Sequence, residues 1–344
     1  MRTGESSVIA AVEDAALRAE IVRRRPMRYA GGADPRHDRP AHVRAASGVV
    51  WAGPHLAVIQ DDASFLALVD SETGLAHSVP LPASPGGARQ FDDTRGNKAK
   101  KLDLEALTAV PNANGTLLAA FGSGSLTPRE IVVLIALADD APRDVTVRPA
   151  AALYAQLRNA AAFSGTELNI EGAVFVSDAI RVFGRGNGAR MGDVVPVNAS
   201  CDLPWPELAR YLENPAAVAP PAPRAITQYA LGTLNGVPLG FTDAARGCGD
   251  SVLYAAAAEA SPDATRDGAI SGSVIGVIEP GGLTARWTAL LDETGRPFTG
   301  KVEGVALDPR ERGRILAVVD SDDHARASDL LEIAIGGPWW GERA

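Results

Sequence analysis

The sequence predicts an all-β fold, a β-propeller with five blades, from three observations. A motif made of an apolar residue, a Glu, a small residue and an apolar run recurs along the chain. Short apolar runs that read as strands follow each copy, and polar clusters end them. The 35 Gly and 24 Pro residues are enough for many tight turns. Four short strands in a unit of roughly forty to fifty residues are typical of a propeller blade.

Three copies of the motif are clear, and they define the unit. They are Leu104-Glu105-Ala106-Leu107, Ile170-Glu171-Gly172-Ala173 and Val302-Glu303-Gly304-Val305. A second apolar run follows each copy, at residues 116–121, 179–183 and 314–319, and it stops in a small or polar cluster. This pattern predicts two strands joined by a turn, repeated along the chain.

Two weaker copies complete the set of five units. They are Ala46-Ser47-Gly48-Val49 and Phe241-Thr242-Asp243-Ala244, so the five anchor residues are Ser47, Glu105, Glu171, Asp243 and Glu303. Third strands are predicted at 65–70, 130–137, 193–198, 274–279 and 330–335. Fourth strands are predicted at 77–81, 226–231 and 285–291. The remaining length is assigned to loops, above all to an insertion at 204–223 that contains a short helix.

The two ends of the chain predict how the ring closes. The fifth unit has three strands before the chain runs out, and residues 20–29 form an unassigned extended segment. Placed as the outer strand of the last blade, this segment would leave no open edge. We therefore expect an N-terminal extension at 1–19 and a single propeller domain at 20–340. A β-sandwich of sequential hairpins is the alternative, whereas the gaps between strands are too short for an α/β fold.

Composition and charge exclude several classes of protein. A net charge of −9 argues against binding to nucleic acid, which needs a basic face. No run of eighteen or more apolar residues is present, and the first 25 residues lack the apolar stretch of a signal peptide. Cys201 and Cys248 are too few for a disulfide framework. We expect a cytoplasmic protein that binds neither membrane nor nucleic acid and whose partner is a small-molecule substrate or ligand, which could be anionic.

The repeated acids predict a site at one mouth of the channel. In a propeller the first strand of each blade lines the channel and the second returns to the same face, so the anchors and the clusters should converge there. Oxygen ligands without His or Cys suit a hard cation, and a flexible shell favours Ca²⁺ over Mg²⁺. The predicted ligands are Glu105, Glu171, Asp243 and Glu303. Alternatively, each acid accepts backbone hydrogen bonds without a metal, with Arg185 and Arg129 as charge partners.

Two residues are candidates for catalysis at this mouth. His324 follows an acidic cluster and could act as a base, and Arg185 lies in the run Phe-Gly-Arg-Gly-Asn. No Gly-x-Ser-x-Gly elbow is present, and the run Gly122-Ser123-Gly124-Ser125 reads as a turn and not as a P-loop. The sequence therefore leaves two functions open: a metal-dependent hydrolase, or a non-catalytic ligand-binding or scaffold propeller.

The motifs also resemble those of a known group of proteins. Over residues 44–335, Asp103-Leu104-Glu105-Ala106 and Val302-Glu303-Gly304 resemble the repeated motif of bacterial phytase-like or esterase-like β-propellers. More distantly, the chain is similar to gluconolactonase and paraoxonase propellers. The resemblance implies Ca²⁺ at the channel, held by the four anchor acids, and hydrolysis of esters, lactones or phosphoesters. Ser47 departs from this pattern, because the first unit lacks an acid.

Overall fold

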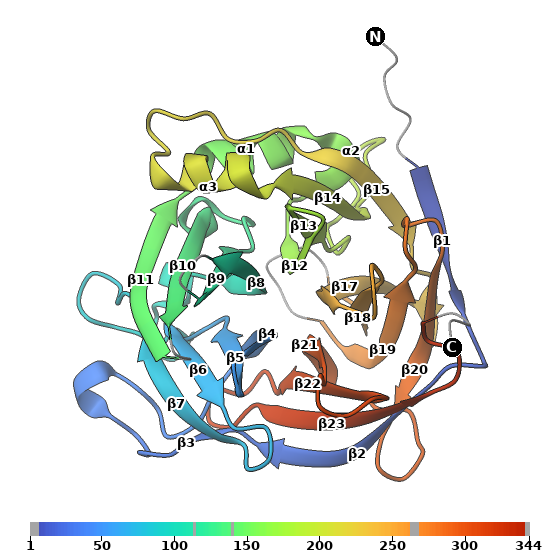
Figure 1. Ribbon diagram of the computed structural model, residues 1–344, viewed down its shortest axis with the longest axis horizontal. Coiled ribbons are helices and arrows are strands. Elements are labelled where there is room, and N and C mark those ends of the chain that lie inside the picture. The colour runs from blue at the N-terminus through green and yellow to red at the C-terminus, as the bar shows by residue number, and fades with distance from the viewer. Residues whose placement is uncertain (1–6, 113–114, 139–140, 262–267, 341–344) are drawn as a thin grey trace.

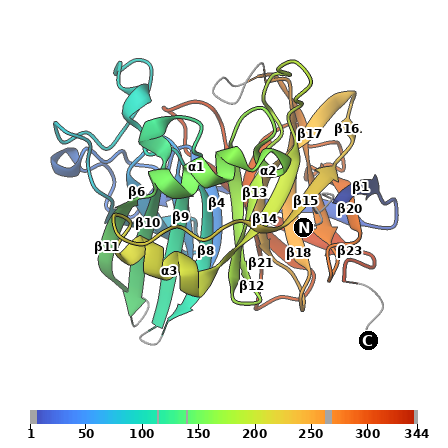
Figure 2. The ribbon, with the colours of Figure 1, turned by 90° about the horizontal axis from the view of Figure 1, so that it is seen from above.

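The computed structural model describes residues 7–112, 115–138, 141–261 and 268–340. Its strands are grouped around a common centre, with β4, β8, β12, β17 and β21 innermost (Figure 1). Short helices lie on one side of the rim, outside the strands (Figure 2). The fold is therefore mostly β and propeller-like.

Antiparallel pairing divides most of the strands into five units of four. The units are numbered in the order in which their inner strands occur along the chain. Unit 1 contains β4 (Ala46–Ala52), β5 (His55–Gln60), β6 (Phe65–Val69) and β7 (Leu75–Pro80). Unit 2 contains β8 (Leu104–Asn112), β9 (Gly115–Gly122), β10 (Ile131–Ala138) and β11 (Ala141–Pro149). Unit 3 contains β12 (Ile170–Val176), β13 (Ala179–Gly184), β14 (Asn198–Pro204) and β15 (Arg224–Ala230).

The last two units follow the same order. Unit 4 contains β17 (Val237–Arg246), β18 (Val252–Glu259), β19 (Ile270–Ile278) and β20 (Ala285–Leu291), and the short β16 (Thr233–Leu234) pairs with β17. Unit 5 contains β21 (Lys301–Leu307), β22 (Arg314–Asp320) and β23 (Asp329–Gly336) from the C-terminal part of the chain. Its fourth strand is β2 (Arg18–Pro26), which comes from near the N-terminus and pairs antiparallel with β23.

The N-terminal segment contacts four of the five units. β1 (Ser7–Glu13) runs parallel to β15 of unit 3 and then to β20 of unit 4. β2 lies between β20 and β23, and β3 (Arg28–Tyr29) pairs with β7 of unit 1. Units 3, 4 and 5 thus belong to one hydrogen-bonded sheet of fourteen strands. The sequence predicted an N-terminal extension at 1–19. In the structure, β1 and the first two residues of β2 lie in that range and pair with strands of the units.

The hydrophobic core lies between the units. Each of five core clusters combines residues of two neighbouring units, in the order 1 with 2, 2 with 3, 3 with 4, 4 with 5 and 5 with 1. The inner strands contact one another in the same cyclic order, including β21 with β4. Both faces of each unit are therefore covered, which explains why β5, β6 and β18 are apolar without alternation.

Two α-helices follow β11, the outer strand of unit 2, and a third lies between β14 and β15 of unit 3. α1 (Ala151–Asn159) and α2 (Ala161–Ser164) precede unit 3, and α3 (Trp205–Glu213) is the short helix expected in the insertion at 204–223. The strand predicted at 193–198 is wrong, because β14 begins only at Asn198 and continues to Pro204. Pro196 lies inside the predicted segment and has no N–H to donate to a sheet, which favours a loop there.

Candidate functional site

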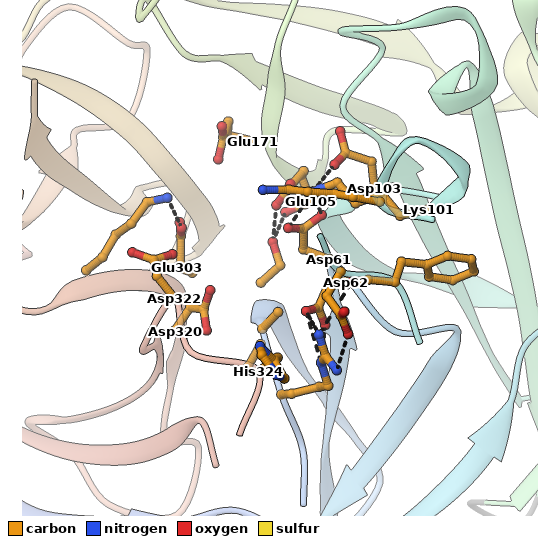
Figure 3. Close-up of a pocket in the computed structure, with 18 of the residues that line it drawn as sticks. Asp61, Asp62, Lys101, Asp103, Glu105, Glu171, Glu303, Asp320, Asp322 and His324 are labelled. Atoms are coloured by element: carbon orange, nitrogen blue, oxygen red, sulfur yellow. Dashed lines mark hydrogen bonds and ion pairs between the residues drawn. The ribbon is translucent and has the colours of Figure 1, made fainter. Parts of the chain in front are cut away.

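A β-bulge at the start of the inner strands sets the direction of the anchor side chains. The register of β8 with β9 shifts around Glu105, that of β12 with β13 around Glu171, and that of β21 with β22 around Glu303. In β4 the shift spans Ser47 and Gly48. A bulge adds one residue to one strand and re-aims its side chain. Glu105, Glu171 and Glu303 consequently turn toward the same central space (Figure 3).

That space is a cavity of about 360 Å³ at one mouth of the channel. Twelve carboxylates and six basic side chains line it, so acids outnumber bases two to one. Asp61, Asp62, Glu259, Asp320 and Asp322, which end the second strands or follow them, share the cavity with the anchors. The anchors of units 1, 2, 3 and 5 thus converge on the cavity with the clusters of units 1, 3, 4 and 5, whereas the cluster Gly122-Ser123-Gly124-Ser125 of unit 2 does not line it.

Asp243, the fourth predicted ligand, lies outside this cavity. The bulge in β17 falls on Thr242, one residue earlier, so Thr242 occupies the position of Glu105, Glu171 and Glu303. A shift of one residue turns a side chain to the opposite face of a strand. Asp243 is instead buried against β21, where its Oδ2 accepts a hydrogen bond from the Val305 amide at 2.8 Å. As arranged, Asp243 does not share a metal site with the other three anchors.

The tightest group of acids lies between units 1 and 2. Oxygen atoms of Asp61, Asp103 and Glu105 all lie within 4.8 Å of one another. The buried Lys101 ammonium contacts this acidic triad, at 2.5 Å from Asp61 and 2.6 Å from Asp103. Arg129 lies 2.7 Å from Asp103. Glu105 forms no ion pair with any base among the described residues, and it accepts a hydrogen bond from the Ser47 hydroxyl.

A second ionic network crosses units 3, 4 and 5. Arg185 Nη2 donates to Glu259 at 2.6 Å, and its Nη1 lies 3.5 Å from Glu171. Lys301 Nζ lies 2.5 Å from Glu303 and 3.4 Å from Glu259. Glu303 Oε2 is buried and has no hydrogen-bond partner in the part of the chain that the structure describes. The network therefore leaves one carboxylate oxygen unsatisfied beside the cavity.

The remaining acids of the mouth divide into paired and unpaired groups. Arg44 Nε donates to both oxygens of Asp62, at 2.8 and 2.9 Å, and is almost fully buried. Asp320, at the end of β22, makes no ion pair in the described part of the chain and accepts only from the Ser321 amide. Among the described residues, Asp320 and Glu105 are thus the partly buried acids of the mouth without a basic partner, whereas Asp322 and Asp323, which are also unpaired, are exposed.

Burial and mutual repulsion change the proton affinities of these carboxyl groups. Burial, reinforced by Asp61, Glu171 and Asp103, raises the pKa of Glu105 well above its ordinary value. Burial and the nearby Asp322 do the same to the pKa of Asp320. Burial raises the pKa of Glu171 to about 8, although Arg185 opposes the rise. A cation in the cavity would favour the ionised forms of all three.

Both predicted catalytic residues line the cavity. His324 follows the acidic cluster after β22 and lies at its edge (Figure 3). Arg185 is almost fully buried and both ends of its guanidinium contact Glu171 and Glu259. This is the charge-partner role that the sequence offered as the alternative, and Arg129 has the same role toward Asp103. The catalytic assignments of His324 and Arg185 stay predictions.

Sequence reasoning did not predict the ion pairs that three basic residues make at the site. Lys301, Lys101 and Arg44 are buried beside the anchors, and each is paired with one or more carboxylates. A signal existed for Lys301, which lies two residues before Glu303. A lysine that close to a buried anchor acid indicates an internal ion pair and not a solvated charge.

The fold and the site together define a class: a mostly β, propeller-like protein with an acidic cavity on its central axis. Over residues 42–335 the chain matches the model of a family of unknown function, DUF6929, and it belongs to that family. No curated protein matches the sequence. Among the helices of the described residues, none has the length and apolarity needed to cross a membrane.

Solved structures offer only distant likenesses. Glutaminyl cyclase of Myxococcus xanthus is 11% identical with a TM-score of 0.49, over 97% of this chain and 99% of that one. The N-terminal domain of Nup159 is 10% identical with a TM-score of 0.33, over 96% and 100%. A gluconolactonase from Xanthomonas campestris is 10% identical with a TM-score of 0.34, over 85% and 88%. At these TM-scores the likenesses give no information about function.

Proposed function

We propose that this chain is a five-bladed β-propeller that binds a divalent cation at the mouth of its channel, with Ca²⁺ as the first candidate. Five four-stranded units with inner strands in cyclic contact support the blade count. Pairing of β2 with β23 supports closure of the last blade by the N-terminal strand. The resemblance to phytase-like and esterase-like propellers agrees with this architecture.

The observation that carries the cation proposal is the acidic triad. Asp61, Asp103 and Glu105 present oxygens within 4.8 Å of one another, so a single ion could reach all three. Oxygen atoms are the ligands that Ca²⁺ and Mg²⁺ prefer, and Ca²⁺ tolerates irregular shells that Mg²⁺ does not. The unpartnered Oε2 of Glu303 and the unpaired Asp320 add further oxygens around the same cavity. The donor chemistry therefore fits a hard cation.

Lys101 determines how such an ion would enter. Its ammonium already contacts Asp61 and Asp103, and these two acids raise its pKa although burial opposes them. An ion bound by all three acids must displace this ammonium or share the acids with it. We therefore expect cation affinity to rise when Lys101 is replaced by Met, which keeps the length of the side chain and removes its charge.

A hydrolytic activity is the second part of the proposal. A bound cation would polarise the carbonyl or phosphoryl oxygen of an ester, lactone or phosphoester. In this chain His324 would take a proton from an attacking water at the edge of the cavity, and Arg185 would hold Glu171 in place from behind. The polar lining suits a small polar substrate.

The alternative is a non-catalytic ligand-binding or scaffold propeller. One observation favours it: Lys101, Arg129, Arg185 and Lys301 already pair with five of the twelve acids around the cavity, Asp61, Asp103 and Glu259 among them. Buried ion pairs of this kind can fix a unique structure without any ligand. In that case the anchors hold neighbouring blades together and no metal is required.

Calcium titration of the purified protein separates these possibilities. Isothermal calorimetry should show one Ca²⁺ site, and the thermal midpoint should fall with EDTA and recover with Ca²⁺ better than with Mg²⁺. Glu105→Gln should weaken Ca²⁺ binding at least tenfold, whereas Glu213→Gln on the exposed face of α3 should leave it unchanged. A melt that ignores both EDTA and Ca²⁺, with no heat of binding, would refute the cation site and favour the scaffold.

Activity is tested separately from binding. A panel of small esters, lactones and phosphoesters should reveal Ca²⁺-dependent turnover that His324→Gln lowers by at least a hundredfold, a typical effect of losing a general base. Calcium binding without turnover on any of the three classes would retain the binding site and reject the hydrolase.

A further inference from the structure

The opposite end of the central channel contains a second cavity, of about 250 Å³. The later residues of all five inner strands line it, among them Trp51 of β4, Thr108 of β8, Phe175 of β12, Arg246 of β17 and Leu307 of β21. The anchors lie near the beginnings of β4, β8, β12 and β21, so the two cavities occupy opposite ends of these strands. None of the anchors lines the second cavity.

The chemistry of this cavity is the reverse of that at the acidic mouth. None of the described residues that line it is acidic, and apart from Thr108 and Arg246 they are aliphatic, aromatic or proline side chains. Thr108 is buried, and its hydroxyl accepts a hydrogen bond from the Phe175 amide at 3.0 Å. Such a surface favours an apolar body, because burial of apolar area stabilises a complex without needing polar partners.

The aromatic wall of the cavity is held in place before any ligand arrives. Trp51 donates from Nε1 to the Leu307 carbonyl at 2.9 Å. The Arg310 guanidinium lies 4.6 Å from the centre of the Trp51 ring and is itself paired with Asp308. A side chain fixed in this way loses little freedom on binding, which favours affinity.

Of the described residues that line this cavity, Arg246 alone has a charged side chain. It ends β17 and is exposed, and in the described part of the chain its guanidinium makes no ion pair or hydrogen bond. Arg310, Arg286 and Arg181, by contrast, are each paired with an acid. An unpaired guanidinium beside an apolar cavity complements a ligand with an apolar body and an anionic end.

We propose that this cavity binds a small apolar carboxylate, with its ring or branched chain against Trp51 and its carboxylate on Arg246. The volume exceeds the roughly 150 Å³ of a cavity that holds benzene, so one ring with a short acidic chain fits. The net charge of −9 disfavours unspecific uptake of anions, so binding of a carboxylate here depends on the local guanidinium. This inference does not depend on the cation site.

The test compares three probes of one shape: 3-phenylpropionate, the neutral 3-phenylpropanol and the cationic 3-phenylpropylamine. Binding to the full chain is followed by calorimetry and by the fluorescence of Trp51, with Trp51→Phe identifying its share of the signal. We expect the carboxylate to bind most tightly and the amine least. Arg246→Gln should weaken carboxylate binding about fivefold, as loss of an exposed charge pair does, and should leave the alcohol unchanged.

Two further variants locate the site. Ala109→Leu adds bulk to the wall of the cavity and should remove binding of the carboxylate and the alcohol alike. Arg312→Gln changes an exposed arginine outside the cavity and should have no effect. Equal binding of carboxylate and alcohol, or an equal loss in Arg246→Gln and Arg312→Gln, would overturn the anionic ligand. Absence of binding by all three probes, or full binding by Ala109→Leu, would overturn the site.

Discussion

Replacing Ile21 by Ala should destabilise the protein far more than replacing its neighbour Val22. Both residues lie in β2, and they face opposite ways because successive side chains alternate along a strand. Ile21 is 1% exposed and packs with Leu331 and Ile333 of β23, whereas Val22 is 46% exposed. Truncation of a buried Ile to Ala costs about 2–5 kcal/mol, and an exposed substitution stays within about 0.5 kcal/mol.

Urea unfolding followed by circular dichroism measures this difference. The denaturation midpoint of Ile21→Ala should fall with little change in the m-value, and that of Val22→Ala should match the wild type. Equal midpoints for the two variants would show that β2 is not packed against unit 5, and the reasoning would fail.

Deletion of residues 1–26 tests the same point more severely. It removes Leu17 and Ile21 along with the whole of β2, about 3–6 kcal/mol of side-chain burial alone, out of a total stability of about 5–15 kcal/mol.

Three further predictions concern the charged mouth and the packing beneath it. Lys301 and Arg185 lower the pKa of Glu259 to about 2 although burial opposes them. The ionised Glu259 carboxylate therefore stabilises the folded state fully above about pH 4.5, and this stabilisation is lost as the pH falls toward 2. Glu259→Gln should therefore cost about 3 kcal/mol at pH 7 and little at pH 2.5 in urea titrations. Burial raises the pKa of Asp243 well above its ordinary value, so the wild type loses stability as pH rises above about 4. As the pH rises above about 4, the free energy of unfolding of Asp243→Asn should increase relative to that of the wild type, by up to about 1.4 kcal/mol per pH unit. The same pH dependence of stability in both proteins would contradict this prediction. In Gly304→Ala the new Cβ would lie 2.7 Å from a Val318 methyl and 2.9 Å from the Ser47 carbonyl, which should cost about 1–3 kcal/mol, whereas Gly31→Ala meets only the end of Arg39.

The repeat could be predicted because it is written in local patterns of residues. The motif at Glu105, Glu171 and Glu303 places each acid at the same point of an inner strand, and the structure brings the three together. The error at Asp243 arose because the sequence does not mark where a bulge falls. Thr242 takes the extra position in β17, and the acid after it turns away from the cavity.

Charge pairing could not be predicted in the same way. Lys101 reaches Asp61 across 40 positions of sequence, and Arg185 reaches Glu259 across 74. Such pairs depend on which units become neighbours and on how long side chains bend into the channel. Residue type and spacing therefore indicate an acidic mouth. They do not reveal that six basic side chains line it together with the twelve acids.

The pairing of β2 with β23 also has a consequence for synthesis of the chain. Arg25 of β2 and Glu332 of β23 form an ion pair across 307 positions of sequence, so β2 leaves the ribosome long before the strand with which it pairs. At about 5–20 residues per second this delay is roughly 15–60 s. During that time the edges of β2 and of the outer strands beside it are open to pairing with another nascent chain. A chain stalled before residue 329 lacks β23, the antiparallel partner of β2. If β2 of one molecule pairs with β23 of another, and the reverse, the two molecules form a domain-swapped dimer.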